Sequence, residues 1–328
     1  FMKVGSVIVG LMVSVFTVSS AANPDNLYGR HAEGKNGVVA AANPEASKIG
    51  VEVMKKGGNA VDAAVATAFA ISVFEPNASG IGGGGFMLIR MAKTGKTVVI
   101  DYREKAPAKA TPDMFVLDEN GKVVNDEITV GGKASGVPGT VAGLLTALEK
   151  YGTMKRADVM APAIKYAGEG IIVSKNLEGI IQDNYEKLVK FDAASEVYLK
   201  DGLPYEAGDR LVNKDLAATL TKISKEGKKA FYEGEIAKKI ADEVQKQGGL
   251  MTVEDLKNYT IEEREPVVGK YRDYTIISCP PASSGGTHIV QLLNMVENYD
   301  LKAMGDNTPE SWHIWAESMK QAFADRAE

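Results

Sequence analysis

One segment constrains the fold of this chain more than any other, because it reads as a helix that is apolar on nearly every side. The run AVDAAVATAFAISVF (residues 60–74) contains a single charged residue, Asp62. Asn59 stands at the expected N-cap, and Asp62 lies near the positive end of the helix dipole. A helix without a polar face has to be covered on several sides. The sequence therefore predicts a layered globular fold with this helix inside it.

The segments that flank this helix predict another helix and a β-hairpin. Residues 44–56 show apolar residues at helical spacing and are followed by two glycines, which is typical of a helix and its end. On the other side, the glycine-rich residues 80–85 lead into the strand-like residues 86–91. A Lys-Thr-Gly-Lys turn then precedes the β-branched residues 97–100.

The rest of the chain is mostly helical, with one further pair of strands. Helical spacing of apolar residues occurs in segments 138–152, 216–223, 236–244, 289–296 and 308–328. Residues 266–278 contain two short β-rich runs around a turn. Helices, then a hairpin, then more helices and strands argue for an α/β fold whose sheet is covered by helices.

Composition and charge exclude several classes of protein and of site. The 328 residues are 45% hydrophobic and 25% charged, which is ordinary for a globular protein. The formal net charge is −5, whereas a nucleic-acid partner requires clustered positive charge, so we expect no such partner. The chain has one cysteine and three scattered histidines, so we expect no internal disulfide and no metal site. We also expect no cofactor.

The N-terminus predicts export. Lys3 is followed by the apolar residues 4–18 and then by Ser-Ser-Ala-Ala, an order typical of a secretory signal peptide. The 21 uncharged residues between Lys3 and Asp25 are just long enough for a membrane anchor, but serine, threonine and glycine lower their hydrophobicity. We therefore expect residues 1–22 to be a cleaved signal peptide and residues 23–328 to form the mature region. The expected location is periplasmic or extracellular.

Two glycine-containing segments each have a binding and a structural interpretation. Gly80, Gly82 and Gly85 satisfy the dinucleotide pattern G-x-G-x-x-G, but that turn follows a strand and opens a helix, and here the order is reversed. We interpret them as glycines that allow close backbone approach. Ser283–Gly286 precede a helix whose free N–H groups are suited to an anion, but a helix cap is the more common use of such a segment.

The nucleophiles and imidazoles of the chain form no recognisable catalytic pair. Cys279 precedes a proline without a paired histidine motif, so we expect a buried structural thiol. Thr287 and His288 are neighbours on a helix and point in different directions. His31 and His313 stand alone, and no role is assigned to them.

Arg103 is the most informative single residue, because it stands just past a predicted strand end. Asp101 and Glu104 flank it, so one interpretation is a local ion pair at the edge of the sheet. The other is that the planar guanidinium binds a substrate carboxylate through two parallel hydrogen bonds. The physical chemistry of the sequence leaves both interpretations open.

Five blocks, in this order, carry a resemblance to a known family. They are GGNAVDAAVA (57–66), GIGGGGFMLIR (80–90), DYREKAPAKATPDMF (101–115), SGVPGTVAGL (135–144) and PPASSGGTHIVQ (280–291). Together they resemble the γ-glutamyltransferase (γ-glutamyltranspeptidase) family, from about Gly37 to the last residue. One departure is Ala282, where many relatives have a third proline before Ser-Ser-Gly-Gly.

The resemblance implies an N-terminal-nucleophile hydrolase fold of the α/β (α+β layered) class. This is an αββα sandwich with two stacked sheets between helix layers, and it is expected to be incomplete in this chain. Family members cut themselves into a large and a small subunit, and the new N-terminal threonine of the small subunit attacks a γ-glutamyl amide such as glutathione. Its own α-amine serves as the adjacent base. Water or an amino-acid or peptide acceptor then takes the glutamyl group.

The resemblance also implies roles for residues of this sequence. Arg103 matches the family arginine that binds the α-carboxylate of the γ-glutamyl donor, and Glu104 is expected to orient Arg103. Gly82–Gly85 and Ser283–Gly286 match architecture around the site rather than reacting groups. The family's nucleophile block has no match in residues 1–328, so no catalytic residue is assigned. We expect the chain to be most of a large subunit that is inactive without the small subunit of the same precursor.

Three hypotheses follow. The chain is part of an exported γ-glutamyltransferase, part of a related transpeptidase acting on a γ-linked polyglutamate capsule, or a non-catalytic remnant that retains carboxylate binding.

Overall fold

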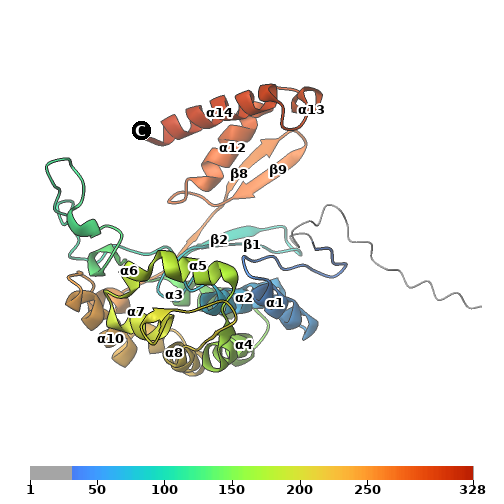
Figure 1. Cartoon of the computed structure of the whole chain (residues 1–328). Helices are drawn as coiled ribbons and strands as arrows, with labels where there is room; N and C mark the ends of the chain where they lie inside the picture. The colour runs from blue at the N-terminus through green and yellow to red at the C-terminus, as the bar shows by residue number, and fades with distance from the viewer. Residues whose placement is uncertain (1–31, 328) are drawn as a thin grey trace, which may run out of the picture. The chain divides into compact units, whose positions relative to one another are not determined.

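The computed structural model describes residues 32–327 (Figure 1). The chain divides into residues 1–38 and residues 39–328, and every helix and strand named below belongs to the second unit. The predicted signal peptide and His31 lie outside the described residues. Within residues 32–327, each helix is either too short or too polar to cross a bilayer.

The apolar helix of the sequence is α2, Ala60–Phe74, and its cap is as predicted. Asn59 Oδ1 accepts hydrogen bonds from the backbone N–H groups of Val61 (2.9 Å) and Asp62 (3.0 Å), and Asp62 Oδ2 accepts one from the N–H of Asn59 (2.8 Å). Ten of its fifteen residues are buried, which confirms that it is covered on several sides. α1, Pro44–Lys55, packs along it as a second predicted helix.

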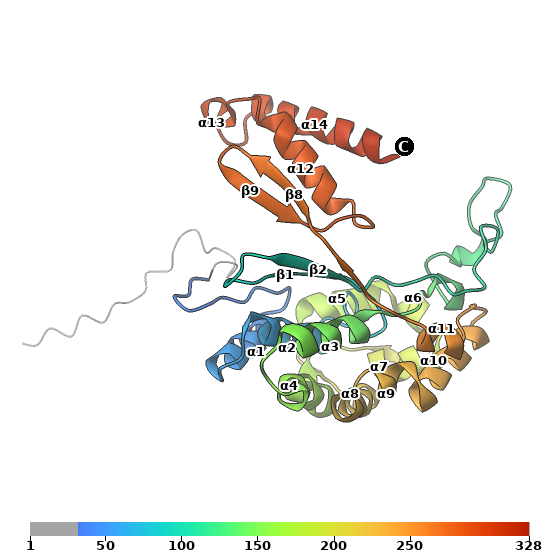
Figure 2. The same ribbon diagram turned by 180° about the vertical axis from the view of Figure 1, so that it is seen from behind.

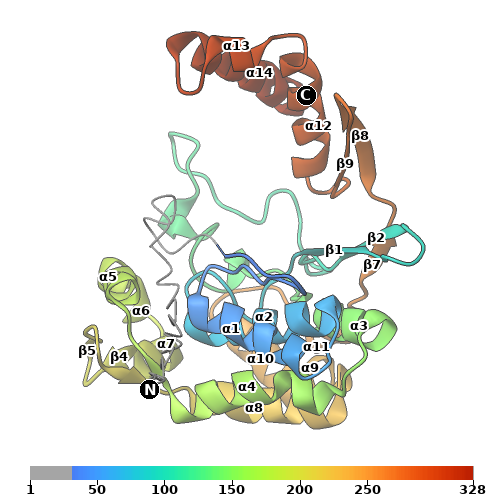
Figure 3. The same ribbon diagram turned by 90° about the vertical axis from the view of Figure 1, so that its right-hand side faces the viewer.

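A group of helices builds the core around α2. They are α3 (Thr140–Tyr151), α4 (Arg156–Glu169), α8 (Lys214–Glu226), α9 (Lys229–Tyr232), α10 (Gly234–Lys246) and α11 (Val253–Lys257). α2 packs against α3 and α4, and α4 lies side by side with α8 (Figure 3). The predicted periodicities in segments 138–152, 216–223 and 236–244 are confirmed as α3, α8 and α10.

The segment between α4 and α8 is less regular than the sequence indicates. It contains the helices α5 (Lys175–Asp183), α6 (Tyr185–Leu188) and α7 (Asp192–Tyr198), and the two-residue strands β3 (Ile171–Ile172), β4 (Leu199–Lys200), β5 (Leu203–Pro204) and β6 (Arg210–Leu211). β3 pairs with β6 and β4 with β5, in both cases antiparallel. Upstream of α3, two 3₁₀ turns span Val124–Asp126 and Gly132–Ala134.

The principal sheet among the described residues has three antiparallel strands in the order β1-β2-β7. β1 (Phe86–Arg90) and β2 (Thr97–Asp101) form the predicted hairpin, and every residue of β2 is buried. β7 (Glu262–Arg264) joins the other edge of β2 with Asp101 opposite Glu262. α3 packs against β1 and β2 (Figure 2), so the sheet has a helical layer on it as expected.

The C-terminal elements form the second predicted pair of strands and the last predicted helices. β8 (Val267–Tyr271) and β9 (Tyr274–Ser278) are joined by a two-residue turn, and α12 (Gly285–Val296) packs against both of them. α13 (Leu301–Met304) and α14 (Pro309–Ala327) follow, and α14 packs against α12.

Candidate functional site

The backbone around Arg103 is fixed by a buried carboxylate at the end of β2. Asp101 is 6% exposed, and its Oδ1 accepts a hydrogen bond from the backbone N–H of Arg103 at 3.1 Å. Its Oδ2 accepts a second bond from Arg264 Nε on β7 at 2.8 Å. Asp101 therefore pairs with Arg264 rather than with the side chain of Arg103, and it fixes the direction in which the chain leaves the strand.

A second hydrogen bond fixes the same residue from the other side. The Tyr259 hydroxyl donates to the backbone carbonyl of Arg103 at 2.8 Å. The Tyr259 ring stacks on Tyr232, with ring centroids 5.6 Å apart and planes 10° from parallel. The Tyr232 hydroxyl in turn donates to the Pro138 carbonyl at 2.9 Å and accepts from the N–H of Ala142 at 3.1 Å. These two stacked tyrosines link the Arg103 backbone to the start of α3.

Glycines surround this segment because larger residues would collide with it. A Cβ atom on Gly84 would lie 2.5 Å from the Tyr102 carbonyl oxygen, and one on Gly139 would lie 2.0 Å from the Tyr259 hydroxyl. Neither contact can be relieved without moving the backbone or the tyrosine. Close approach is confirmed for Gly85, where a Cβ atom would lie 3.1 Å from the Tyr102 ring, but not for Gly80 and Gly82, where a Cβ atom would meet nothing closer than 3.9 Å. The order of helix α2 before strand β1 contradicts a dinucleotide-binding turn.

The side chain of Arg103 is both paired and accessible. Its Nε lies 3.3 Å from Glu104 Oε2, and its guanidinium carbon lies 5.9 Å from the centroid of the Phe86 ring. Yet 55% of the side chain is exposed, and its two terminal nitrogens have no hydrogen-bond or ion-pair partner among residues 32–327. Both interpretations of the sequence are therefore compatible with the geometry. An exposed pair of this kind contributes little to stability by itself.

The next cation along the chain is held differently. Lys105 Nζ donates to Thr260 Oγ1 at 3.1 Å, lies 3.8 Å from Glu262 Oε1, and sits 5.4 Å from the centroid of the Tyr259 ring. The Lys105 ammonium is therefore engaged by its surroundings. Of the two cations at positions 103 and 105, Arg103 is the one with hydrogen-bond donors that have no partner in the described part of the chain.

Burial sets the ionisation of the tyrosines that support the site. It raises the pKa of Tyr102 to about 12, and it raises the pKa of Tyr259 further, with additional contributions from the negative charges of Asp101 and Glu104. Both phenols are therefore protonated at neutral pH. The Tyr259 hydroxyl therefore keeps its hydrogen, and can donate it to the Arg103 carbonyl, over the whole physiological pH range.

A hollow of about 460 Å³ lies beside Glu104. Its lining includes the turn after α2 and the glycines before β1, with Glu104 as its one charged residue. Glu104 Oε1 would lie 3.4 Å from a Cβ atom on Gly83, so the carboxylate rests directly against the glycine segment.

The remaining candidates of the sequence do not join this site as reacting groups. Ser284 stands at the N-cap of α12 but makes no side-chain cap bond, so the predicted cap is wrong in that respect; Ser283 Oγ instead accepts from the N–H of Gly285 at 3.3 Å. His288 Nδ1 lies 2.6 Å from the Ser284 carbonyl rather than near the Thr287 hydroxyl. No ion pair or hydrogen bond of the His313 side chain is found within residues 32–327.

Cys279 is half-buried, not fully buried as expected. Burial and the nearby charge of Asp101 raise the pKa of its thiol, which keeps it protonated and weakly nucleophilic. Across residues 32–327, no three His, Cys, Asp or Glu side chains come together in a way that would hold a metal ion.

Comparison with known proteins identifies the family. The family model described as Gamma-glutamyltranspeptidase matches residues 46–328. The chain belongs to the γ-glutamyltranspeptidase family. It is 48% identical over 295 residues to the glutathione hydrolase proenzyme of Escherichia coli (strain K12), covering 90% of this chain and 50% of that relative. It is 46% identical over 313 residues to the corresponding proenzyme of Bacillus subtilis (strain 168), covering 94% and 53%.

Solved structures of family members share the fold. The γ-glutamyltranspeptidase of Helicobacter pylori matches with a TM-score of 0.87 and 46% identity over 90% of this chain and 85% of that one. The transpeptidase CapD of Bacillus anthracis matches with a TM-score of 0.75 and 34% identity over 90% and 93%. The fold class is therefore that of the N-terminal-nucleophile hydrolases. The chain spans about half the length of the curated relatives it matches.

Sequence reasoning missed two residues of the site, Tyr259 and Arg264. Each reaches the 101–104 segment from about 160 positions further along the chain, and β7, which carries Arg264, is only three residues long and highly charged. The polar residues of β7 favour a loop rather than a strand. The sequence of this segment therefore gave no indication that Arg264 would reach Asp101.

Proposed function

We propose that this chain is the large-subunit part of an exported γ-glutamyltransferase, also called glutathione hydrolase. The complete enzyme cleaves γ-glutamyl amides and transfers the glutamyl group to water or to amino acids and peptides. The observation that carries this proposal is the guanidinium of Arg103, which lies in the family block 101–104 with both terminal nitrogens unengaged by residues 32–327.

Arg103 binds the α-carboxylate of the donor in this proposal. Its planar guanidinium offers two parallel N–H donors, which match the two oxygens of a carboxylate. Asp101 and Tyr259 hold the backbone on either side of the residue, so little freedom is lost when the donor binds. Glu104 accepts a hydrogen bond from Arg103 Nε, which leaves the two terminal nitrogens to bind the donor.

The reaction itself requires a threonine at the N-terminus of the small subunit. Its hydroxyl oxygen attacks the γ-carbonyl carbon of the donor, and the hydroxyl proton passes to the threonine's own α-amine. Collapse of the tetrahedral intermediate breaks the amide bond, and the proton goes to the departing amine. Water, or the amine of an acceptor, then attacks the ester and releases glutamate or a new γ-glutamyl compound. Donor, acceptor and small subunit are thus the three partners of this chain.

The test is an assay of the complete gene product after self-cleavage. We expect it to release cysteinylglycine from glutathione and p-nitroaniline from γ-glutamyl-p-nitroanilide, with faster release of p-nitroaniline when glycylglycine is added as acceptor. A processed, folded protein that leaves both compounds intact overturns the proposal.

N-terminal sequencing of the exported form tests the signal peptide. We expect the mature chain to begin near residue 23.

The second candidate is a transpeptidase acting on a γ-linked polyglutamate; the similarity to the transpeptidase CapD of Bacillus anthracis supports transpeptidation as such. The TM-score of 0.75 for this protein is below the 0.87 found for the γ-glutamyltranspeptidase of Helicobacter pylori, so we favour the small γ-glutamyl donor. Relative turnover of glutathione and poly-γ-glutamate by the complete enzyme discriminates between the two.

A further inference from the structure

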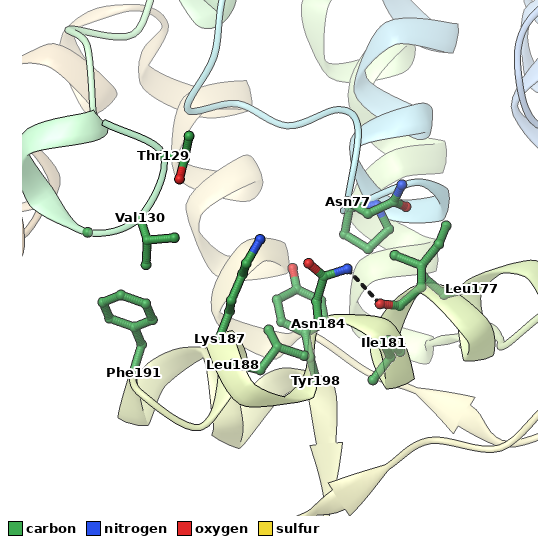
Figure 4. A pocket seen from close by; sticks show the side chains of 13 residues that line it. Asn77, Thr129, Val130, Leu177, Ile181, Asn184, Lys187, Leu188, Phe191 and Tyr198 are labelled. Carbon is green, nitrogen blue, oxygen red and sulfur yellow. Dashed lines mark hydrogen bonds between the residues drawn. The ribbon is translucent and has the colours of Figure 1, made fainter. Parts of the chain in front are cut away.

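A second cavity, of about 490 Å³, lies among α5, α6 and α7 (Figure 4). Three separate stretches of the chain converge on it: the turn at residues 76–77, the loop at residues 129–131, and the helices between residues 177 and 198. Neither Arg103 nor Glu104 lines it. Its size is in the range of cavities that bind small organic molecules.

Seven of the thirteen residues that line this cavity are apolar, and the one charged residue, Lys187, is exposed. The apolar lining residues are Pro76, Val130, Leu177, Ile180, Ile181, Leu188 and Phe191. Lys187 is the one charged residue among the lining side chains. Figure 4 shows it extending from α6 into the space between the loop at Thr129 and Val130 and the turn at Asn77. Its ammonium group has no carboxylate partner within residues 32–327.

Two further polar groups at the cavity have unused hydrogen-bonding capacity. Asn184 donates from Nδ2 to the Ile180 carbonyl at 2.9 Å, and its amide oxygen has no partner among the described residues. The Tyr198 hydroxyl likewise makes no hydrogen bond to residues 32–327. Burial raises the pKa of Tyr198, so its phenol stays protonated and can donate. Isolated polar groups in an apolar wall are characteristic of a site that orients a ligand.

We propose that this cavity binds a small monocarboxylic acid with an apolar chain or ring. The carboxylate pairs with the Lys187 ammonium, and the apolar part of the ligand packs between α5, the Phe191 ring and Val130. One cation without an ion-pair partner among the described residues matches one negative charge, and the apolar part of the lining disfavours a second charged group on the ligand. A cationic or zwitterionic molecule of the same size lacks a partner for its positive charge.

The hollow beside Glu104 is the natural competitor for such a ligand, because it shares Pro76 and Asn77 with this cavity. The two differ in charge, since Glu104 is the charged residue there and Lys187 is the charged residue here. Glu104 is already paired with Arg103, and the lining of the first contains no cation, whereas Lys187 offers a monocarboxylate a cation in the second. The proposal does not depend on the enzymatic activity of the protein.

Octanoate binding to the complete gene product, measured by isothermal titration calorimetry without any γ-glutamyl donor, tests the proposal. We expect saturable binding of octanoate, and Lys187→Met is expected to weaken it by about tenfold or more through loss of the charge-assisted bond. Lys187→Arg keeps the charge and is expected to retain most of the affinity. Lys190→Met is the matched control, because Lys190 is exposed two residues after α6 and does not line the cavity.

Three results overturn the proposal. The first is no octanoate binding at millimolar concentration, as expected if another part of the protein fills the cavity. The second is equal weakening by Lys187→Met and Lys190→Met, which indicates attraction to the general surface charge. The third is loss of octanoate binding on Arg103→Lys, which places the ligand in the donor site instead. None of these outcomes bears on whether the enzyme cleaves γ-glutamyl amides, which the separate assay decides.

Discussion

Two cations separated by one residue, Arg103 and Lys105, illustrate how the contacts of a side chain determine what it can bind. Both cations lie over an aromatic ring and near a carboxylate, but Lys105 Nζ also donates to a hydroxyl, whereas Arg103 makes its hydrogen bond through Nε and leaves its two terminal nitrogens without a partner in the described part of the chain. The sequence places both in one block and cannot separate them. The contacts that engage Lys105 come from Tyr259, Thr260 and Glu262, which reach this segment only in the folded chain.

Arg103→Lys is expected to raise the KM for the γ-glutamyl donor with a smaller change in kcat. A point charge replaces a two-pronged donor, and the loss is on the order of 2–4 kcal/mol. Steady-state kinetics on the complete enzyme provide the measurement. Arg90→Lys, an exposed arginine on β1, is the control and should leave the KM unchanged. An unchanged donor KM in Arg103→Lys would show that the carboxylate binds elsewhere.

Tyr259→Phe tests whether the backbone of Arg103 has to be held. The substitution keeps the stacking on Tyr232 and removes the single hydrogen bond to the Arg103 carbonyl. A bond of this type contributes about 0.5–1.5 kcal/mol, so we expect the donor KM to rise by roughly 2- to 10-fold with kcat nearly constant. Tyr274→Phe, on an exposed tyrosine of β9, serves as the comparison. Equal effects of the two substitutions would assign Tyr259 a general role in stability only.

At the scale of the elements, the helices were predictable because local chemistry specifies them. α1, α2, α3, α8 and α10 combine helical spacing with a clear end, and the hairpin β1–β2 combines β-branched residues with a turn. β7 and the short strands β3–β6 were not predictable, since each exists only through pairing with a partner strand. The part of the site that depends on β7, the bond from Arg264 to Asp101, was missed for the same reason.

Asp62 links α2 to the residues that follow α3 through hydrogen bonds. Its substitution tests how much these bonds stabilise the fold. Besides capping α2, its carboxylate accepts from Thr153 Oγ1 at 2.6 Å and from the N–H groups of Thr153 (3.0 Å) and Met154 (3.1 Å). Asp62→Asn removes the charge and replaces one acceptor oxygen by a donor. We expect the free energy of unfolding to fall by roughly 2–3 kcal/mol in chemical denaturation. Asp183→Asn, on an exposed residue at the end of α5, should change it little.

The same carboxylate predicts a pH dependence of stability. Burial alone raises the pKa of Asp62, but the hydrogen bonds from Thr153, Asn59 and Met154 outweigh it and leave the pKa below its ordinary value of 3.8. A pKa that is lower in the folded state stabilises the fold fully above the unfolded pKa, and the stabilisation is lost as pH falls below it. The stability gap between the native protein and Asp62→Asn should therefore be constant near neutral pH and shrink below about pH 4. A gap that persists at pH 2.5 would contradict this assignment.

At the scale of the whole molecule, the chain holds Arg103, for which we propose donor binding, but no match to the attacking group of its family. It spans about half the length of its curated relatives, and residues 1–328 contain no match to the family's nucleophile block. Several large apolar side chains of α14 are also exposed, including Trp312 at 58% and Phe323 at 60%. Surface of this kind is typical of a face that contacts further polypeptide.

We therefore expect purified residues 23–328 to release no p-nitroaniline from γ-glutamyl-p-nitroanilide, because no hydroxyl is activated by an adjacent N-terminal amine. The complete gene product, expressed and processed in parallel, is the positive control. Binding and turnover have to be measured separately, since a chain that keeps Arg103 can still bind the donor. Glutamate that raises the melting temperature of the isolated chain, but not of its Arg103→Lys variant, would show that carboxylate binding survives without catalysis. Turnover by the isolated chain at a rate comparable to that of the complete enzyme would instead place the nucleophile within these residues and overturn the two-subunit interpretation.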